Sequence, residues 1–134
     1  MIRWIVLLAG ILGAIGVAVG AHAAHGLEKF LTGQGLAEAD VLKRLEQCDV
    51  AVRYHLIHTV ALLTIGLSTS RRSVNLKNAA AVFILLGIAL FCGGLYSMVY
   101  AGQMGHWAIV PLGGLCFIIG WLLTAATAFS PDQK

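Results

Sequence analysis

The sequence predicts an all-α integral membrane four-helix bundle with an amphipathic surface helix between its first two spans. Of its 134 residues, 59% are hydrophobic and 11% are charged, whereas soluble domains are about half apolar and about a quarter charged. The mean hydropathy is +0.87. Four apolar stretches are long enough to cross a hydrocarbon core of about 30 Å as helices. They form a single domain with spans at about 4–24, 51–70, 78–100 and 107–129.

The first stretch follows Arg3 and is expected to be a retained membrane span. Ala21 and Ala23 around His22 mimic a secretory cleavage site. The apolar run is nevertheless longer than the ~7 to 15 residues of a signal core, which favours a span. Small residues in this stretch predict that another helix approaches closely. The glycines concerned are Gly13, Gly16 and Gly20.

The segment at about 36–50 is predicted to be amphipathic. Its apolar residues recur every third position, with charged residues between them, which is typical of a helix on the membrane surface or capping the bundle. We expect this helix to continue into the second span, which Arg71 and Arg72 bound at its far end. Counting back about 20 residues from Ser70 places Arg53, His55 and His58 within the membrane thickness or its interface.

Small residues also pattern the last two spans. In the third, Ala80, Gly87, Gly94 and Ala101 recur every seven residues, which predicts a groove for one neighbouring helix. The fourth span has Pro111 near its start, where a helix tolerates proline. A second stripe of small residues follows, comprising Gly113, Cys116, Gly120, Thr124 and Thr127.

Four spans place both termini on the same side of the membrane. That side carries five basic residues in short segments, namely Arg3, Arg71, Arg72, Lys77 and Lys134. The other side has four, namely Lys29, Lys43, Arg44 and Arg53, mixed with acids. The positive-inside rule therefore predicts cytoplasmic termini in a bacterial-type inner membrane. The net charge of +3 is too small and too dispersed to indicate nucleic-acid binding.

Two histidine pairs are the candidate site. His22 and His25 end the first span, and His55 and His58 begin the second. Histidines three apart share a helix face, and we expect the hairpin to bring both pairs, with His106, toward the outer face of the membrane. Imidazoles there could bind a metal or haem. The interpretation we favour is that they form hydrogen bonds between helices.

Other polar residues give weaker signals. Arg53 is interpreted as a snorkelling or paired interface residue, and Tyr54 adjoins His55. Three cysteines without CxxC spacing exclude a disulfide framework and a zinc motif of the usual kind.

Four short motifs resemble the small four-helix membrane proteins of domain-of-unknown-function family 423, the YgdD-like proteins. They are AHGL at 24–27, YHLIH at 54–58, GIALFCGGLY at 87–96 and PLGGLCFIIGW at 111–121. The resemblance implies that His22 and His55 are additions to the family pattern, so that His25 and His58 become the pair of interest. It implies no biochemical activity. The positions it matches are Gly26, Tyr54, His58, Phe91, Gly94, Tyr96, Pro111, Gly113, Gly114, Gly120 and Trp121.

Two functions follow as hypotheses. The first is a non-enzymatic structural or accessory component of the lipid bilayer that forms homo-oligomers through its glycine stripes and needs no cofactor. The glycines concerned are Gly13, Gly16, Gly20, Gly87, Gly94, Gly113 and Gly120. The alternative is a small transporter, or a metal or haem carrier, in which His25 and His58 act with Tyr54, Tyr96 and Arg53. The spans have no Asp or Glu in their apolar cores, which argues against a proton-coupled exporter. They also have no nucleophile and base pair, which argues against an enzyme.

Overall fold

The computed structural model describes residues 1–68, 73–103 and 107–129, which are helical with short connections. Four of its helical stretches are long and apolar enough to cross a membrane. This confirms the predicted all-α four-span class. The elements are α1 (Arg3–His25), α2 (Leu27–Gly33), α3 (Glu38–Leu67), α4 (Val74–Gly87), the π-helical turn η1 (Ile88–Cys92), α5 (Gly93–Ala101), α6 (Ile109–Ala126) and the 3-10 turn η2 (Thr127–Phe129).

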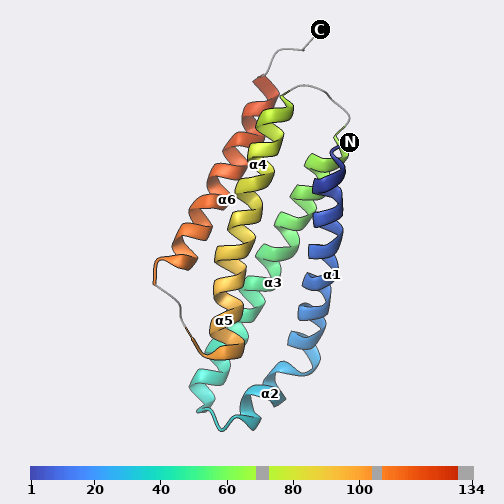
Figure 1. Cartoon of the computed structure of the whole chain (residues 1–134). Coiled ribbons are helices and arrows are strands. Elements are labelled where there is room, and N and C mark those ends of the chain that lie inside the picture. Colours follow the sequence, from blue (N-terminus) through green and yellow to red (C-terminus); the bar gives the residue numbers. More distant parts are fainter. Residues whose placement is uncertain (69–72, 104–106, 130–134) are drawn as a thin grey trace.

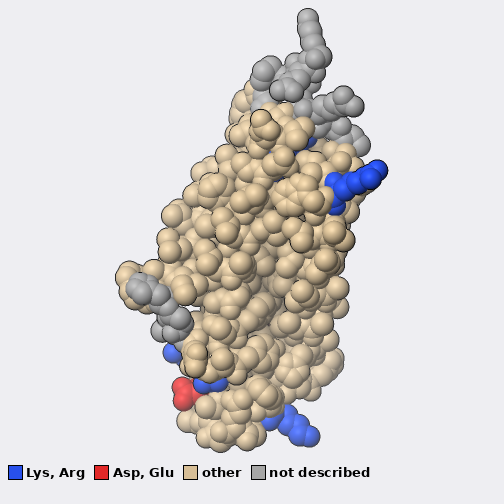
Figure 2. Space-filling view, in the orientation of Figure 1, with Lys and Arg blue, Asp and Glu red and all other residues tan. Residues whose placement is uncertain are grey.

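The helices form two antiparallel pairs (Figure 1). In the N-terminal hairpin α1 packs along α3, and in the C-terminal hairpin the continuous rod of α4, η1 and α5 packs along α6. The two hairpins meet mainly where α3 contacts η1 and α5. α1 begins and α6 ends at the same end of the bundle, which we call the terminal end (Figure 1). Charged side chains lie near the two ends of the face seen in Figure 2, with an uncharged zone between them.

Glycines set the spacing within the N-terminal hairpin. A Cβ added at Gly16 would lie 2.7 Å from Leu56, and one at Gly20 would lie 3.3 Å from Val52. Gly13 has Thr59 at 3.6 Å. Because these glycines face α3, the two backbones approach closely, as small residues allow in membrane helices.

In the C-terminal hairpin, each helix packs a large side chain against a glycine of the other. Phe117 of α6 occupies the space where Gly87 would carry a Cβ, and Ile84 of α4 lies 2.7 Å from a Cβ added at Gly120. Ala80, Gly87 and Gly94 all face α6, whereas Ala101, the last position of the predicted seven-residue groove, is exposed. The groove therefore ends before the helix does.

The backbones come closest at Gly113. A Cβ there would fall on the backbone of Phe91, which lies in the π-helical turn η1. A π-turn adds a residue to one turn of helix and is costly without a tertiary contact to stabilise it. The contact with Gly113 holds this wider turn against α6.

α3 has 30 residues, so it is about 45 Å long and exceeds a hydrocarbon core of about 30 Å. The predicted amphipathic segment is its N-terminal part and continues into the second span without a break. Of the two placements that the pattern allowed, the segment adopts the capping one. Its apolar side packs on α2 and α5 through a cluster of Leu27, Leu31, Val41, Cys48 and Val99.

Arg44 fastens this cap to the C-terminal hairpin. Its guanidinium Nη1 donates to the carbonyl oxygen of Val99 at 3.2 Å, at the C-terminal end of α5. A cation at a helix C-terminus is favoured by the helix dipole. Gly102 ends the helix with a φ of 64°, a left-handed conformation that favours glycine.

Candidate functional site

An aromatic cluster surrounds His58 where α3, η1 and α6 meet. We call it the His58 cluster, and it comprises Tyr54, His58, Phe91, Phe117 and Trp121. His58 is 5% exposed, and its ring stacks on Phe117 with centroids 3.5 Å apart. The Tyr54 ring lies 5.8 Å from the His58 ring and 4.7 Å from the Phe91 ring. The cluster therefore joins the two hairpins near the middle of the bundle.

Both nitrogens of the His58 ring are engaged. Nδ1 lies 2.7 Å from the carbonyl oxygen of Tyr54, and because a carbonyl only accepts, Nδ1 carries the hydrogen. The indole Nε1 of Trp121 donates to Nε2 at 3.2 Å. A neutral imidazole offers one donor and one acceptor, and here both are used. Binding a metal through Nε2, or protonating it, would break the bond to Trp121.

His55 links the hairpins at a second point. Its Nδ1 lies 3.1 Å from the hydroxyl of Tyr96 on α5, and the residue is 2% exposed. Its Nε2 is buried and has no hydrogen-bond partner within the described part of the chain. His55 and His58 therefore face different neighbours, although they lie three positions apart on one helix.

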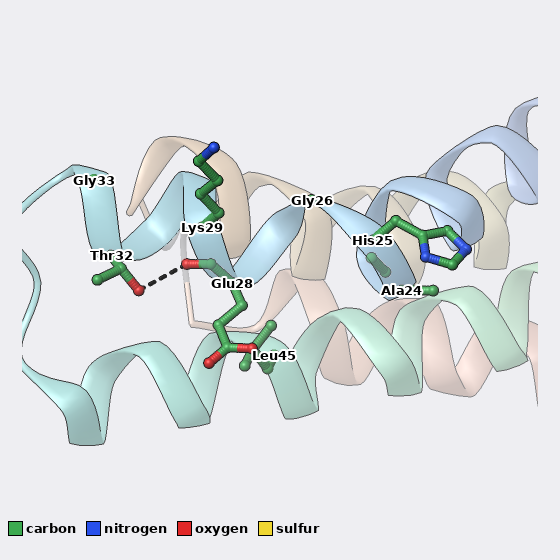
Figure 3. Close-up of a pocket in the computed structure, with 9 residues that line it drawn as sticks. Ala24, His25, Gly26, Glu28, Lys29, Thr32, Gly33 and Leu45 are labelled. Carbon is green, nitrogen blue, oxygen red and sulfur yellow. Dashed lines mark hydrogen bonds between the residues drawn. The ribbon is translucent and has the colours of Figure 1, made fainter.

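The histidines of α1 also separate. His22 lies against the rings of Phe30 and Tyr100, with centroids 6.1 and 5.8 Å away. His25 is exposed and lines a surface groove of about 740 Å³ with Glu28 and Lys29 of α2. Figure 3 shows these three side chains pointing in different directions, with His25 turned away from the other two. They do not converge on a common ligand position.

The expectation that the two histidine pairs meet at one end is wrong. Gly16 lies opposite Leu56 and Gly20 opposite Val52, so this register places His25 opposite position 47 of α3. His58 is eleven positions further along α3, which separates it from His25 by about 16 Å along the axis. The reason is that α2 and the N-terminal part of α3 lengthen the connection, so the pairs sit at different levels.

The remaining candidates have separate roles. Tyr54 belongs to the His58 cluster, and Tyr96 binds His55. Arg53 forms an exposed ion pair with Asp49 one turn away on α3, which fits the paired interface residue expected from the sequence. His106 lies outside the described residues. Within residues 1–68, 73–103 and 107–129, no three His, Cys, Asp or Glu side chains are grouped as a metal site would require.

The sequence alone does not assign the partners of His58. The family resemblance marks Trp121 and Phe91 only as matched positions, and no pattern in the sequence assigns a role to Phe117. The signal available in the sequence was the indole of Trp121, a hydrogen-bond donor within an otherwise apolar stretch, because such a donor usually finds a partner when buried.

Comparison with known proteins identifies the family. The family described as "Protein of unknown function (DUF423)" matches residues 19–114. The chain belongs to the DUF423 family. The four motifs predict this membership, and the match covers the first three of them and the start of the fourth, residues 111–114.

Relatives of this chain are membrane proteins by name. A "UPF0382 membrane protein" of Haemophilus influenzae is 37% identical over 91% of this chain and 90% of its own length. A Staphylococcus haemolyticus relative, "UPF0382 membrane protein SH2409", is 35% identical over 89% of this chain and 93% of its own length. The "UPF0382 inner membrane protein YgdD" of Escherichia coli is 32% identical over 98% of this chain and 94% of its own length. No solved structure matches the chain. This DUF423 protein is thus a small integral membrane protein of a family without a known activity.

Proposed function

We propose that this protein is a non-enzymatic accessory component of the membrane that acts by associating with a second copy of itself through the outer face of α1. The glycine stripes expected to mediate such association are used inside the molecule, because Gly13, Gly16 and Gly20 face α3 and the remaining ones lie between α4, α5 and α6. Another stripe therefore has to supply the contact.

The observation that carries the proposal is an exposed row of small residues on α1. Gly10, Ala14 and Ala18 are four residues apart and all exposed, and a Cβ added at Gly10 would meet nothing within 4 Å. Spacing of this kind lets two membrane helices cross closely. Exposed Leu7 and Ile11 flank the row and would pack around the crossing.

Ala14→Leu is expected to weaken self-association about tenfold or more, because a branched side chain separates the two backbones at the crossing. The measurement is energy transfer between donor- and acceptor-labelled protein in vesicles, titrated against lipid. Ala125→Leu is the matched control, since Ala125 is exposed on α6 outside the row. Equal dissociation constants for Ala14→Leu and the unmodified protein would exclude this face.

The geometry favours this function over a metal or haem carrier. The carrier hypothesis requires His25 and His58 to bind the same ligand. The two side chains lie at different levels of the bundle, so they do not form one binding site. The lone pair of His58 that would bind a metal accepts the indole hydrogen of Trp121.

We propose further that the terminal end faces the cytoplasm, as the positive-inside rule predicts. Cys48 is fully buried and Cys92 likewise, so the test uses an introduced cysteine at exposed Glu38, at the end opposite the termini. In a background in which the native cysteines are replaced, Glu38→Cys is expected to react with a membrane-impermeant maleimide in intact spheroplasts. Arg3→Cys is expected to react only after lysis. The reverse labelling pattern would show that the terminal end faces away from the cytoplasm and would contradict the proposed orientation.

A further inference from the structure

Two buried polar atoms on one face of α3 have no hydrogen-bond partner in the described part of the chain. They are Nε2 of His55 and Oγ1 of Thr59, which lie four positions apart and therefore share a helix face. His55 is 2% exposed and Thr59 is 5% exposed. Native proteins rarely leave such atoms without a hydrogen bond, so a partner has to be found for both.

Both side chains face α1. A Cβ added at Gly16 would lie 3.6 Å from Cδ2 of His55, the ring atom bonded to Nε2. One added at Gly13 would lie 3.6 Å from Cγ2 of Thr59. α1 and α3 pack alongside each other at this level (Figure 1). The two polar atoms therefore belong to the interface between these helices.

The backbone of α1 offers an acceptor beside His55. The ring interacts with the carbonyl group of Leu12, but this carbonyl is not placed to hydrogen-bond Nε2 directly. The other ring nitrogen, Nδ1, faces the Tyr96 hydroxyl on α5 at 3.1 Å, so Leu12 lies on the Nε2 side of the ring. Because a carbonyl oxygen only accepts, it favours the tautomer with the hydrogen on Nε2. Nδ1 then accepts the hydroxyl hydrogen of Tyr96.

The Thr59 hydroxyl is not satisfied by its own helix. Thr32, Thr64 and Thr124 each donate to the carbonyl oxygen four positions back, which is a common bond for threonine within a helix. Thr59 makes no such bond with the carbonyl of His55. Its hydroxyl can therefore bond to a group outside α3.

Both atoms lie near the middle of the bilayer. Thr59 and His55 come eight and twelve positions before Leu67, the last residue of α3, which places them about 12 and 18 Å from that end of the span. The midplane of a hydrocarbon core of about 30 Å lies at about 15 Å. Lipid tails offer no hydrogen bonds at this depth, so the missing partner has to be held inside the protein.

The interface between α1 and α3 is looser beside Thr59 than one turn away. A Cβ added at Gly16 would be only 2.7 Å from the Leu56 side chain. A Cβ added at Gly13 would have one neighbour within 4 Å among the described residues, the methyl carbon of Thr59 at an ordinary contact distance. The missing side chain of Gly13 therefore leaves room for a small molecule next to the hydroxyl.

We propose that one water molecule is bound between α1 and α3 at this point. It accepts a hydrogen bond from Nε2 of His55 and donates to Oγ1 of Thr59 and to the carbonyl oxygen of Leu12. Three hydrogen bonds are typical of a buried water. The water completes a polar row from Tyr96 on α5 through α3 to the backbone of α1. This site is on the inner face of α1 and is independent of the self-association proposed for the outer face.

NMR of the full chain with ¹⁵N-labelled histidine in phospholipid nanodiscs tests the site directly. The Nε2 hydrogen of His55, assigned by its loss in His55→Gln, is expected to show a cross-peak with water. Thr59→Val, which has nearly the same shape but no hydroxyl, should lose this cross-peak. Thr64→Val is the matched control and should keep it, because the Thr64 hydroxyl bonds to its own helix. The proposal is overturned if the unmodified protein lacks the cross-peak, or if it arises from the Thr59 hydroxyl alone.

Unfolding equilibria in mixed detergent micelles give a second test whose two outcomes have opposite signs. If the hydroxyl of Thr59 bonds to a water, Thr59→Val should lower the folding equilibrium constant about fivefold, because a hydrogen bond is lost. If the hydroxyl had no partner, the same substitution would remove an unsatisfied polar group and raise the constant. A more stable Thr59→Val would therefore overturn the proposal. Thr64→Val should change the constant much less than Thr59→Val does.

Discussion

Gly113→Ala is expected to destabilise the protein by about 3 kcal/mol, in the upper range for overpacking a tight contact. The added methyl group would fall on the backbone of Phe91. Backbone cannot rotate aside as a flexible side chain can, so α6 would have to move away from η1. That movement would also pull Phe117 out of the space at Gly87 and disturb the ring stack on His58.

Gly114→Ala is the matched control for this variant. The neighbouring glycine lies on the same helix, and a Cβ there would be 3.9 Å from the Phe91 ring, an ordinary van der Waals contact. Alanine is favoured over glycine within helices by up to ~1 kcal/mol, so this variant should be neutral or more stable. Reversible unfolding in mixed detergent micelles, followed by circular dichroism, measures both. Equal stabilities for the two variants would contradict the close contact of α6 with η1.

His58→Ala is expected to cost about 3 kcal/mol, comparable to the truncation of other buried rings. It removes the stack on Phe117 and two hydrogen bonds, and leaves a cavity at the junction of the hairpins. His25→Ala should change stability by no more than about 0.5 kcal/mol, because His25 is exposed. The same unfolding measurement applies to both.

A third variant separates packing from hydrogen bonding at His58. Trp121→Phe keeps an aromatic ring but removes the indole donor, and should cost about 1 kcal/mol. In a double-mutant cycle, the loss should disappear when His58 is already alanine. Metal analysis of the purified proteins completes the comparison. A stoichiometric metal that is present in the unmodified protein and lost in His58→Ala would support the carrier hypothesis over the proposed function.

The four spans were predictable because a membrane imposes a length of about 20 apolar residues on each crossing helix. The glycines also predicted close helix contacts, since few other residues allow them. The short helix α2 was not predicted, because Leu27–Gly33 has only seven residues and two charged side chains. A helix of that length depends on packing, here on α3, more than on its own propensity.

The site was harder to predict because it depends on register. HxxH spacing predicts that two rings share a face, but it does not determine which helix each ring meets. His58 finds its donor in Trp121, 63 residues away, and His55 finds Tyr96, 41 residues away. The π-helical turn is likewise determined by the contact between Phe91 and Gly113, and no pattern in residues 88–92 alone predicts it.

The division into two interlocked hairpins bears on how the protein is made. α1 and α3 complete their mutual glycine contacts within residues 1–68, before any of the C-terminal half is needed. As the chain leaves the ribosome, the first pair of spans can therefore enter the bilayer and pack together while the second pair is still being translated. The His58 cluster contains residues of both hairpins, so it forms only after the second hairpin has been inserted.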